Sequence, residues 1–200
     1  MLTKLFNVAR FASQFEIPAD LETVPEYLAV EDKWILAEFS ETMDTVKTAW
    51  ENIDIYSATQ ALKTFGTGVL PSHYLEMVKS RLYDDDTAAA WTLHRIVRDF
   101  MTAFTPVCPF FTHHISETLY GRSAVEVDIF PVSADSSVDL GTDEGDRLRG
   151  LSALVQSFNG DTWNAKKEQG ISLNQPVSGI EIPNELEDFT AILTRMHHLE

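Results

Sequence analysis

Two histidines and a glutamate near residue 115 are the best candidates for metal chemistry in this sequence. His113, His114 and Glu117 fall within one expected short helix, about 110–120. Adjacent histidines on a helix point about 100° apart, whereas His114 and Glu117, at i and i+3, can share one face. Metal-binding helix bundles need a second such pair from a neighbouring helix, and the sequence offers none. We expect a structural role, with His114 hydrogen-bonded at a helix start, and no metal site.

Other catalytic signatures are absent from the sequence. It has no glycine-rich phosphate loop, no Gly-x-Ser-x-Gly elbow and no Cys-x-x-Cys. The single cysteine, Cys108, excludes an internal disulfide framework and fits a reducing compartment. The run Asp84–Asp86 predicts a helix cap, because consecutive side chains do not converge on one ion. We therefore expect no catalytic residue in this chain.

Basic residues cluster in places where they could contact RNA. Two clusters lie beside aromatic side chains: Arg10 with Phe11, and Lys166 and Lys167 with Trp163. Aromatic rings flanked by cations suit the unstacked bases of an RNA loop. The alternative is that each cation is solvated or paired with a carboxylate.

The net charge of −16 opposes nucleic-acid binding in general. Salt confines surface fields to about 8 Å under physiological conditions, so a local basic patch can still act on an acidic protein. If RNA binds, the cations must cluster in space.

Apolar residues at helical spacing predict helices over 2–15, 87–104 and 110–120, a helix of about twenty residues from Asp32, and helical runs within 54–83. Gly66, Gly68 and Pro71 should break or kink the 54–83 region. Short connections between these helices predict a helix bundle over residues 1–122.

The composition changes after residue 122. Residues 123–145 are predicted to form an extended arm and an acidic linker. Residues 146–200 show a helix over 147–167, a strand over Pro176–Pro183 and a helix over 184–197. The strand has no obvious partner, which indicates a truncated unit. The predicted fold class is an all-α helix bundle with a small, incomplete α/β C-terminal appendage.

Seven segments, spread in order over nearly the whole chain, carry motifs of one family. They are Lys4–Phe11 (KLFNVARF), Asp32–Leu36 (DKWIL), Tyr74–Tyr83 (YLEMVKSRLY), Thr105–Phe110 (TPVCPF), His114–Tyr120 (HISETLY), Ser123–Pro131 and Arg147–Leu173. In this order they resemble the anticodon-binding region of class I valyl-tRNA synthetases of the archaeal type. Departures are Phe6 where tryptophan is common, Val125-Glu126 in place of Val-His, and Pro71 within a helix that is normally continuous.

The resemblance implies a domain that binds the anticodon loop and stem of tRNA(Val) and positions it for ATP-dependent aminoacylation. Neither the His-Ile-Gly-His nor the Lys-Met-Ser-Lys-Ser signature occurs here, so this chain alone should be inactive and hold no cofactor. ATP and Mg²⁺ would belong to the parent enzyme, whose catalytic and editing domains are the other expected partners.

The resemblance and the charge pattern together give a set of expected tRNA contacts. Arg10 is the expected anticodon contact, with Phe11 as its packing anchor, and five cations are expected on phosphates. The full set is Arg10, Phe11, Lys33, Lys79, Arg81, Trp163, Lys166 and Lys167.

Three other interpretations remain open. The same domain could come from an isoleucyl- or leucyl-tRNA synthetase, although Asn7–Arg10 favours valine. The acidity and the polar 133–145 segment would suit a helical scaffold that binds other proteins, and the histidines would suit a metal-carboxylate enzyme. The sequence has no apolar run of membrane-spanning length and no signal peptide, which predicts a cytoplasmic protein.

Overall fold

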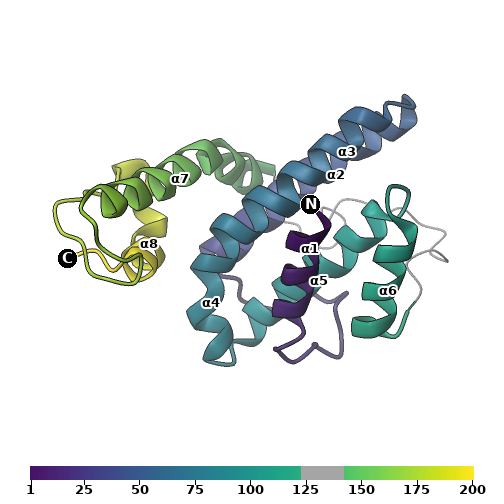
Figure 1. Cartoon of the computed structure of the whole chain (residues 1–200), viewed down its shortest axis with the longest axis horizontal. Helices are drawn as coiled ribbons and strands as arrows, with labels where there is room; N and C mark the ends of the chain where they lie inside the picture. The colour runs from purple at the N-terminus through teal and green to yellow at the C-terminus, as the bar shows by residue number, and fades with distance from the viewer. Residues whose placement is uncertain (123–141) are drawn as a thin grey trace.

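The computed structural model describes residues 1–122 and 142–200, and these residues form a bundle of helices with a helical appendage (Figure 1). No strand occurs within these two ranges, so the predicted all-α class is confirmed. The elements are α1 (Leu2–Ala12), α2 (Val30–Glu51), α3 (Ile55–Thr64), the π-helix η1 (Phe65–Tyr74), α4 (Leu75–Tyr83), α5 (Thr87–Phe104), α6 (Pro109–Tyr120), α7 (Thr142–Glu168), the 3₁₀-helix η3 (Asn184–Phe189) and α8 (Thr190–His197).

Helix α5 is the centre of the bundle and contacts α1, α2, α4 and α6. A row of aromatic rings fills the interior of the bundle. The ring centroids of Phe39 and Phe65 are 5.1 Å apart, those of Phe65 and Phe100 are 6.3 Å apart, and those of Phe100 and Phe104 are 5.7 Å apart. All four side chains are buried. Large aromatic side chains bury the most area per residue, which is why the apolar stripes in the sequence located this core.

The chain stays helical from 55 to 83 through α3, η1 and α4. Of the break or kink predicted at Gly66, Gly68 and Pro71, the break is therefore wrong. The chain passes Pro71 inside the π-helix η1. In a π-helix each N–H bonds to the carbonyl five residues earlier, which shifts away the carbonyl that a proline ring would meet in an α-helix. Gly66 in the same segment lies against α1 and α5: a Cβ there would be 2.5 Å from Phe100 Cζ and 2.9 Å from Leu5 Cδ2.

The aspartate run ends in a helix cap, as predicted. Asp86 Oδ1 accepts hydrogen bonds from the backbone N–H groups of Ala88 and Ala89, both at 3.0 Å. Satisfying these N–H groups fixes the start of α5.

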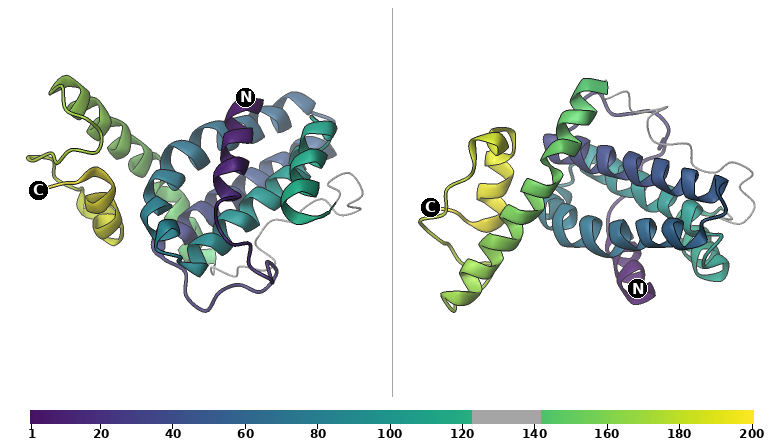
Figure 2. Two further views of the ribbon diagram at one scale, coloured as in Figure 1. Left: turned by 60° about the horizontal axis from the view of Figure 1, so that its bottom comes forward. Right: turned by 90° about the horizontal axis from the view of Figure 1, so that it is seen from above.

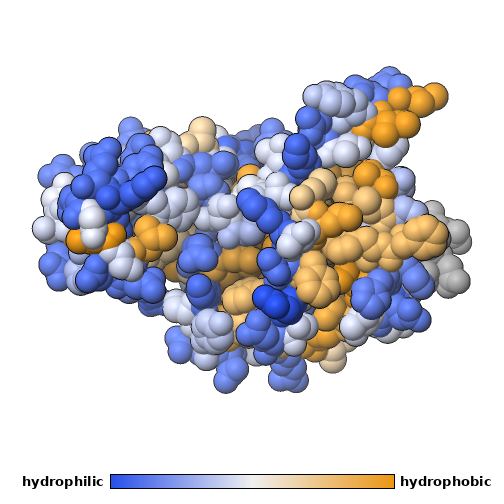
Figure 3. All heavy atoms as spheres, in the orientation of Figure 1, coloured by the Kyte–Doolittle hydropathy of each residue, from blue (hydrophilic) through white to orange (hydrophobic). Residues whose placement is uncertain are grey.

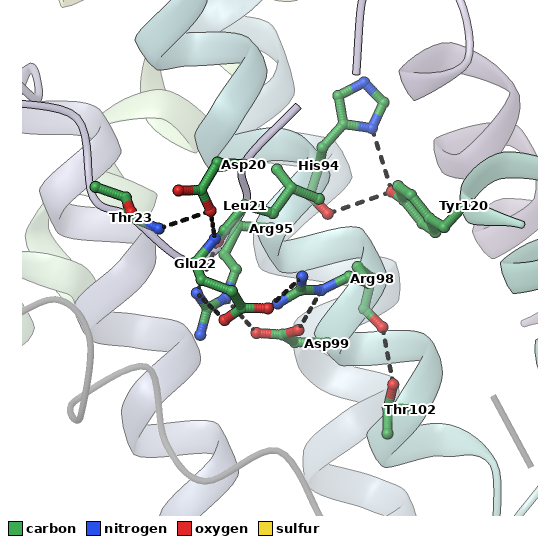
Figure 4. Close-up of polar contacts among 10 residues, drawn as sticks. All are labelled: Asp20, Leu21, Glu22, Thr23, His94, Arg95, Arg98, Asp99, Thr102 and Tyr120. Atoms are coloured by element: carbon green, nitrogen blue, oxygen red, sulfur yellow. Dashed lines mark hydrogen bonds and ion pairs between the residues drawn. The ribbon is translucent and has the colours of Figure 1, made fainter. Parts of the chain in front are cut away.

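A buried polar cluster holds the segment between α1 and α2 against α5 (Figure 4). Arg95 Nε donates to Asp99 at 2.5 Å, and Arg95 Nη1 donates to the carbonyl of Leu21 at 2.9 Å. Arg98 lies between Asp99, at 3.0 Å, and Glu22, at 2.7 Å. These two arginines have internal partners and belong to the frame of the bundle.

The appendage, α7 to α8, packs across the start of α2, as Figure 2 shows from two sides. Trp34 of α2 donates its indole N–H to Ser152 of α7 at 3.3 Å, and its ring meets Phe189 edge-on at 6.5 Å. The buried amine of Lys166 donates to the carbonyls of Leu173 and Gln175, both at 2.7 Å, and so holds the loop after α7.

The strand predicted over 176–183 is not formed. Val177 makes one isolated bridge to Leu199, and the residues that follow have no ladder. The described part of the appendage is therefore helical rather than α/β. Most of the 123–145 linker predicted from the sequence lies outside the described residues, and its last positions, from 142, already belong to α7.

None of the helices in the described ranges is both long enough and apolar enough to cross a membrane.

Candidate nucleic-acid interface

A groove between α1 and the η1–α4 helix brings together residues from two of the predicted clusters. It encloses about 180 Å³. Phe11 and Lys79, both predicted as tRNA contacts, line it together with Lys4. Its remaining lining residues are Asn7, Val8, Pro71, Leu75 and Glu76.

The groove carries exposed positive charge along both walls. Lys4 of α1 donates to the carbonyl of Thr67 at 3.1 Å, which fixes its amine at the rim. The Lys79 side chain is 49% exposed and its amine lies 3.7 Å from Glu76, too far for a tight pair. Arg10 is exposed on α1, next to Phe11. The walls thus offer cations to a phosphate backbone.

Lys63 of α3 lies on the same face of the α3–η1–α4 helix as Lys79, but it was not among the tRNA contacts predicted from the sequence. Its carbonyl accepts from the Thr67 hydroxyl at 2.8 Å, one turn before the point where Lys4 binds. The signal was present: Lys63, Thr67, Pro71, Leu75 and Lys79 recur every four residues, which places them on one face of a helix.

Phe11 lies in a cluster of three rings at one end of the groove. Its centroid is 5.0 Å from that of Phe15 and 6.4 Å from that of Tyr83, and both contacts are edge-to-face. Phe15 and Tyr83 are 5.5 Å apart. Tyr83 is exposed, so the cluster presents one aromatic ring to solvent beside the cations.

Arg81 is two residues from Lys79 but points into the protein. Its guanidinium lies 2.7 Å from Glu31, 2.8 Å from Asp32 and 2.9 Å from Asp86. Burial raises the pKa of the Asp32 carboxyl, and the Arg81 charge opposes that rise. Tyr74 also donates its hydroxyl to Asp32 at 2.8 Å. The donors of Arg81 are therefore committed to carboxylates.

Lys33 lies at a second cavity, of about 580 Å³, between the bundle and the appendage. Its amine is 3.1 Å from Glu144, and nearby Arg147 pairs with Asp188 at 2.6 Å. Acidic and basic side chains line this cavity in equal number, whereas the groove is lined by two lysines and one glutamate.

Trp163, Lys166 and Lys167 lie on α7, on the other side of α4 from α1 (Figure 1). Trp163 is half-buried between the rings of His73 and His197, at 5.6 and 5.7 Å. Lys166 is fully buried, and Lys167 is exposed. Of these three, Lys167 alone presents its charge to solvent.

Asn159 connects the two histidines that flank Trp163. Its amide donates to Nδ1 of His73 at 3.1 Å, and its carbonyl oxygen accepts from Nε2 of His197 at 2.8 Å. Burial lowers the pKa of His197 to about 4 and also lowers that of His73. Both rings are therefore neutral near pH 7, and the bond that His73 Nδ1 accepts requires that this nitrogen be unprotonated.

Among the described residues no group of three histidine, cysteine or acidic side chains is arranged to hold a metal ion. The pair formed on α6 is His113 with Glu117, at 3.5 Å, rather than His114 with Glu117. His114 is exposed and does not take the helix-start role expected of it.

Comparison with known proteins places this sequence in a family. Residues 32–182 match the model of the anticodon-binding domain of tRNA ligases. The chain is 31% identical over its whole length to valine–tRNA ligase of Saccharolobus solfataricus, covering 24% of that protein. It is 32% identical to the enzyme of Aeropyrum pernix, over 98% of the chain and 24% of the relative. It is 33% identical to the enzyme of Methanothrix thermoacetophila, over 92% of the chain and 20% of the relative.

The chain thus spans about a quarter of the length of the ligases it matches. The match runs from the start of α2 through α6 to α7 of the appendage, and it includes the helix that carries Lys79 but not α1. This chain belongs to the family of anticodon-binding domains of tRNA ligases.

Proposed function

We propose that this chain is the tRNA-binding part of a valine–tRNA ligase that works in the cytoplasm. It would dock the anticodon loop and stem of tRNA(Val), while a catalytic domain elsewhere in the longer enzyme, with ATP and Mg²⁺, esterifies the acceptor end. The family match and the valine–tRNA ligases among its relatives support this proposal. The observation that carries it is the α1–α4 groove, where cations flank an aromatic cluster on a strongly acidic protein.

The groove offers the two interactions that bind a single-stranded loop. Lys4 and Lys79 in the groove, together with Arg10, which is exposed on α1 outside the groove lining, neutralise phosphates and release their counterions. The ring cluster that ends in Tyr83 offers a face on which an unpaired base can stack. Acidic surface elsewhere repels the RNA and so favours binding at this one place.

The remaining predicted residues divide by their surroundings. Lys167 is exposed on α7 and is proposed as a stem phosphate contact, with Trp163 one turn before it on the same helix. Lys33 lies towards the other end of α7, where it pairs with Glu144. Arg81 and Lys166 are left out of the proposed contact set, because their donors already bind carboxylates and carbonyls inside the protein.

The experiment is a titration of tRNA(Val) at low salt, with an anticodon-changed transcript, tRNA(Ile) and tRNA(Leu) for comparison. Arg10→Ala and Lys79→Ala should each weaken binding of tRNA(Val) by about fivefold. Each should also make the slope of log K against log salt concentration shallower, by the contribution of roughly one phosphate contact. Lys47→Ala, an exposed lysine of α2 away from the groove, is the matched control and should leave affinity unchanged. Equal binding of the native and anticodon-changed transcripts would contradict anticodon recognition.

A further inference from the structure

The hairpin of α2 and α3 projects beyond the bundle and ends in an apolar tip (Figure 1). Ile53 is 81% exposed, Tyr56 73% and Ile55 57%. Figure 3 shows apolar surface at the end of this arm. Single exposed apolar residues are ordinary, but a group of three on a projecting arm marks a contact site.

Ile53 adopts a conformation that isoleucine normally avoids. Its φ is 57°, in the left-handed region, where a β-branched side chain is disfavoured. The residue closes the end of α2: its N–H donates to Trp50, and the N–H of Asp54 donates to Ala49 at 2.8 Å. Glycine or asparagine usually occupies such a position. Isoleucine there carries strain and places an apolar side chain at the apex, a combination typical of functional sites.

The sides of the arm are acidic. A concave surface of about 480 Å³ beside the tip is lined by Glu41, Asp44, Thr45, Thr48, Ala49, Asn52, Asp54 and Ser57. Three carboxylates on this surface repel phosphate, which argues against RNA as the occupant. The indole N–H of Trp50 is buried near the tip and has no hydrogen-bond acceptor within the described part of the chain. A surface that complements this arm would be an apolar protein pocket bordered by lysine or arginine.

We propose that the α2–α3 tip docks into another region of the same polypeptide in the longer valine–tRNA ligase. This inference rests on the proposed function. The relatives have most of their length outside the matched quarter, and a tethered region is present at high effective concentration. A domain that presents tRNA to a distant reaction centre must be held in a fixed orientation. The tip supplies such a contact apart from the groove.

Site-specific crosslinking in the full-length enzyme tests the contact. A benzophenone amino acid replaces Ile53, the enzyme is irradiated, and the product is mapped by mass spectrometry. The expected crosslink joins position 53 to a residue outside the 200 residues of this chain. The same probe at Glu168, exposed at the end of α7, is the control for random capture. Crosslinks confined to this chain, crosslinks to a second polypeptide, or none at all would each overturn the proposal.

Substitutions at the tip separate docking from folding. Ile53→Gly and Ile53→Asn suit the left-handed backbone, so each should keep or raise the melting temperature of the full-length enzyme. Both should lower kcat/KM for aminoacylation at least fivefold while tRNA affinity changes less than twofold. Unchanged aminoacylation in both variants would rule the docking out. Failure of the proposed function would look different: the enzyme would not select tRNA(Val), whatever position 53 contacts.

Discussion

Asn159 donates its amide to Nδ1 of His73 at 3.1 Å, and through this bond the appendage is joined to the π-helical segment of the bundle. His73 is two residues from Pro71, which lines the proposed RNA groove. Asn159 also binds His197 of α8, so one side chain fixes the mutual position of η1, α7 and α8.

Asn159→Leu should loosen the appendage without unfolding the bundle. The substitution leaves polar atoms of His73 and His197 without their partner, at a cost of about 1–3 kcal/mol for each buried group. We expect faster amide hydrogen exchange in α8 and unchanged exchange in α5. Equal acceleration in both helices would mean that the two parts unfold together.

The ion-pair cluster of Arg81 should matter for stability rather than for tRNA binding. Arg81→Met leaves the buried carboxylates of Glu31 and Asp32 without their cation. Breaking a buried ion pair in this way lowers the free energy of unfolding by about 3–5 kcal/mol. Lys79→Met, at the exposed neighbour, should stay within about 0.5 kcal/mol. Urea denaturation compares them. Adding Asp32→Asn to Arg81→Met should recover part of the loss, because asparagine needs no cation.

Gly66 and Gly68 should respond in opposite ways to alanine. A Cβ at Gly66 would meet Phe100 and Leu5, and overpacking of this kind costs about 1–3 kcal/mol. A Cβ at Gly68 meets nothing within 4 Å, so Gly68→Ala should stabilise the helix by about 0.4–1 kcal/mol through the unfolded state. Thermal unfolding of the two variants gives the comparison. A destabilised Gly68→Ala would show that η1 does not tolerate a side chain there.

Acid should weaken the fold through His197. Its pKa is about 4 in the folded protein and near 6.5 otherwise, so the unfolded chain binds the extra proton between these values. Stability therefore falls as pH drops from 6.5 towards 4, by at most about 3 kcal/mol from this residue. His197→Gln cannot titrate but can still donate to Asn159. Its unfolding free energy should depend less on pH over that window, and an identical slope in both proteins would remove His197 as the cause.

The helices were predictable because apolar periodicity reports directly which face is buried. Trp34, Phe39 and Phe100 lie in the core for that reason. The two structural errors have a common cause: the outcome depended on contacts far away in the sequence. Pro71 is accommodated by a π-helix, which residue spacing does not reveal, and the 176–183 alternation found no neighbouring strand.

Whether an individual lysine or arginine side chain is exposed or paired inside the protein was less predictable, because this too depends on residues far away in the sequence. Lys79 and Arg81 look alike in the sequence, yet Arg81 binds Glu31, which is 50 residues away. Lys166 is covered by a loop that its own amine organises. Charge type and aromatic neighbours identify candidates, but only the fold shows which side chains keep their charge at the surface.

The π-helical segment makes the rotational phase of the following helix depend on chain length. Deleting one residue from 66–70 would rotate the following helix relative to α3, unless the segment returned to α-helical spacing. Lys79 would leave the groove, and Arg81 would lose its carboxylates in the same step. A one-residue change in this segment would therefore damage binding chemistry and the fold together, even though it alters no charged residue.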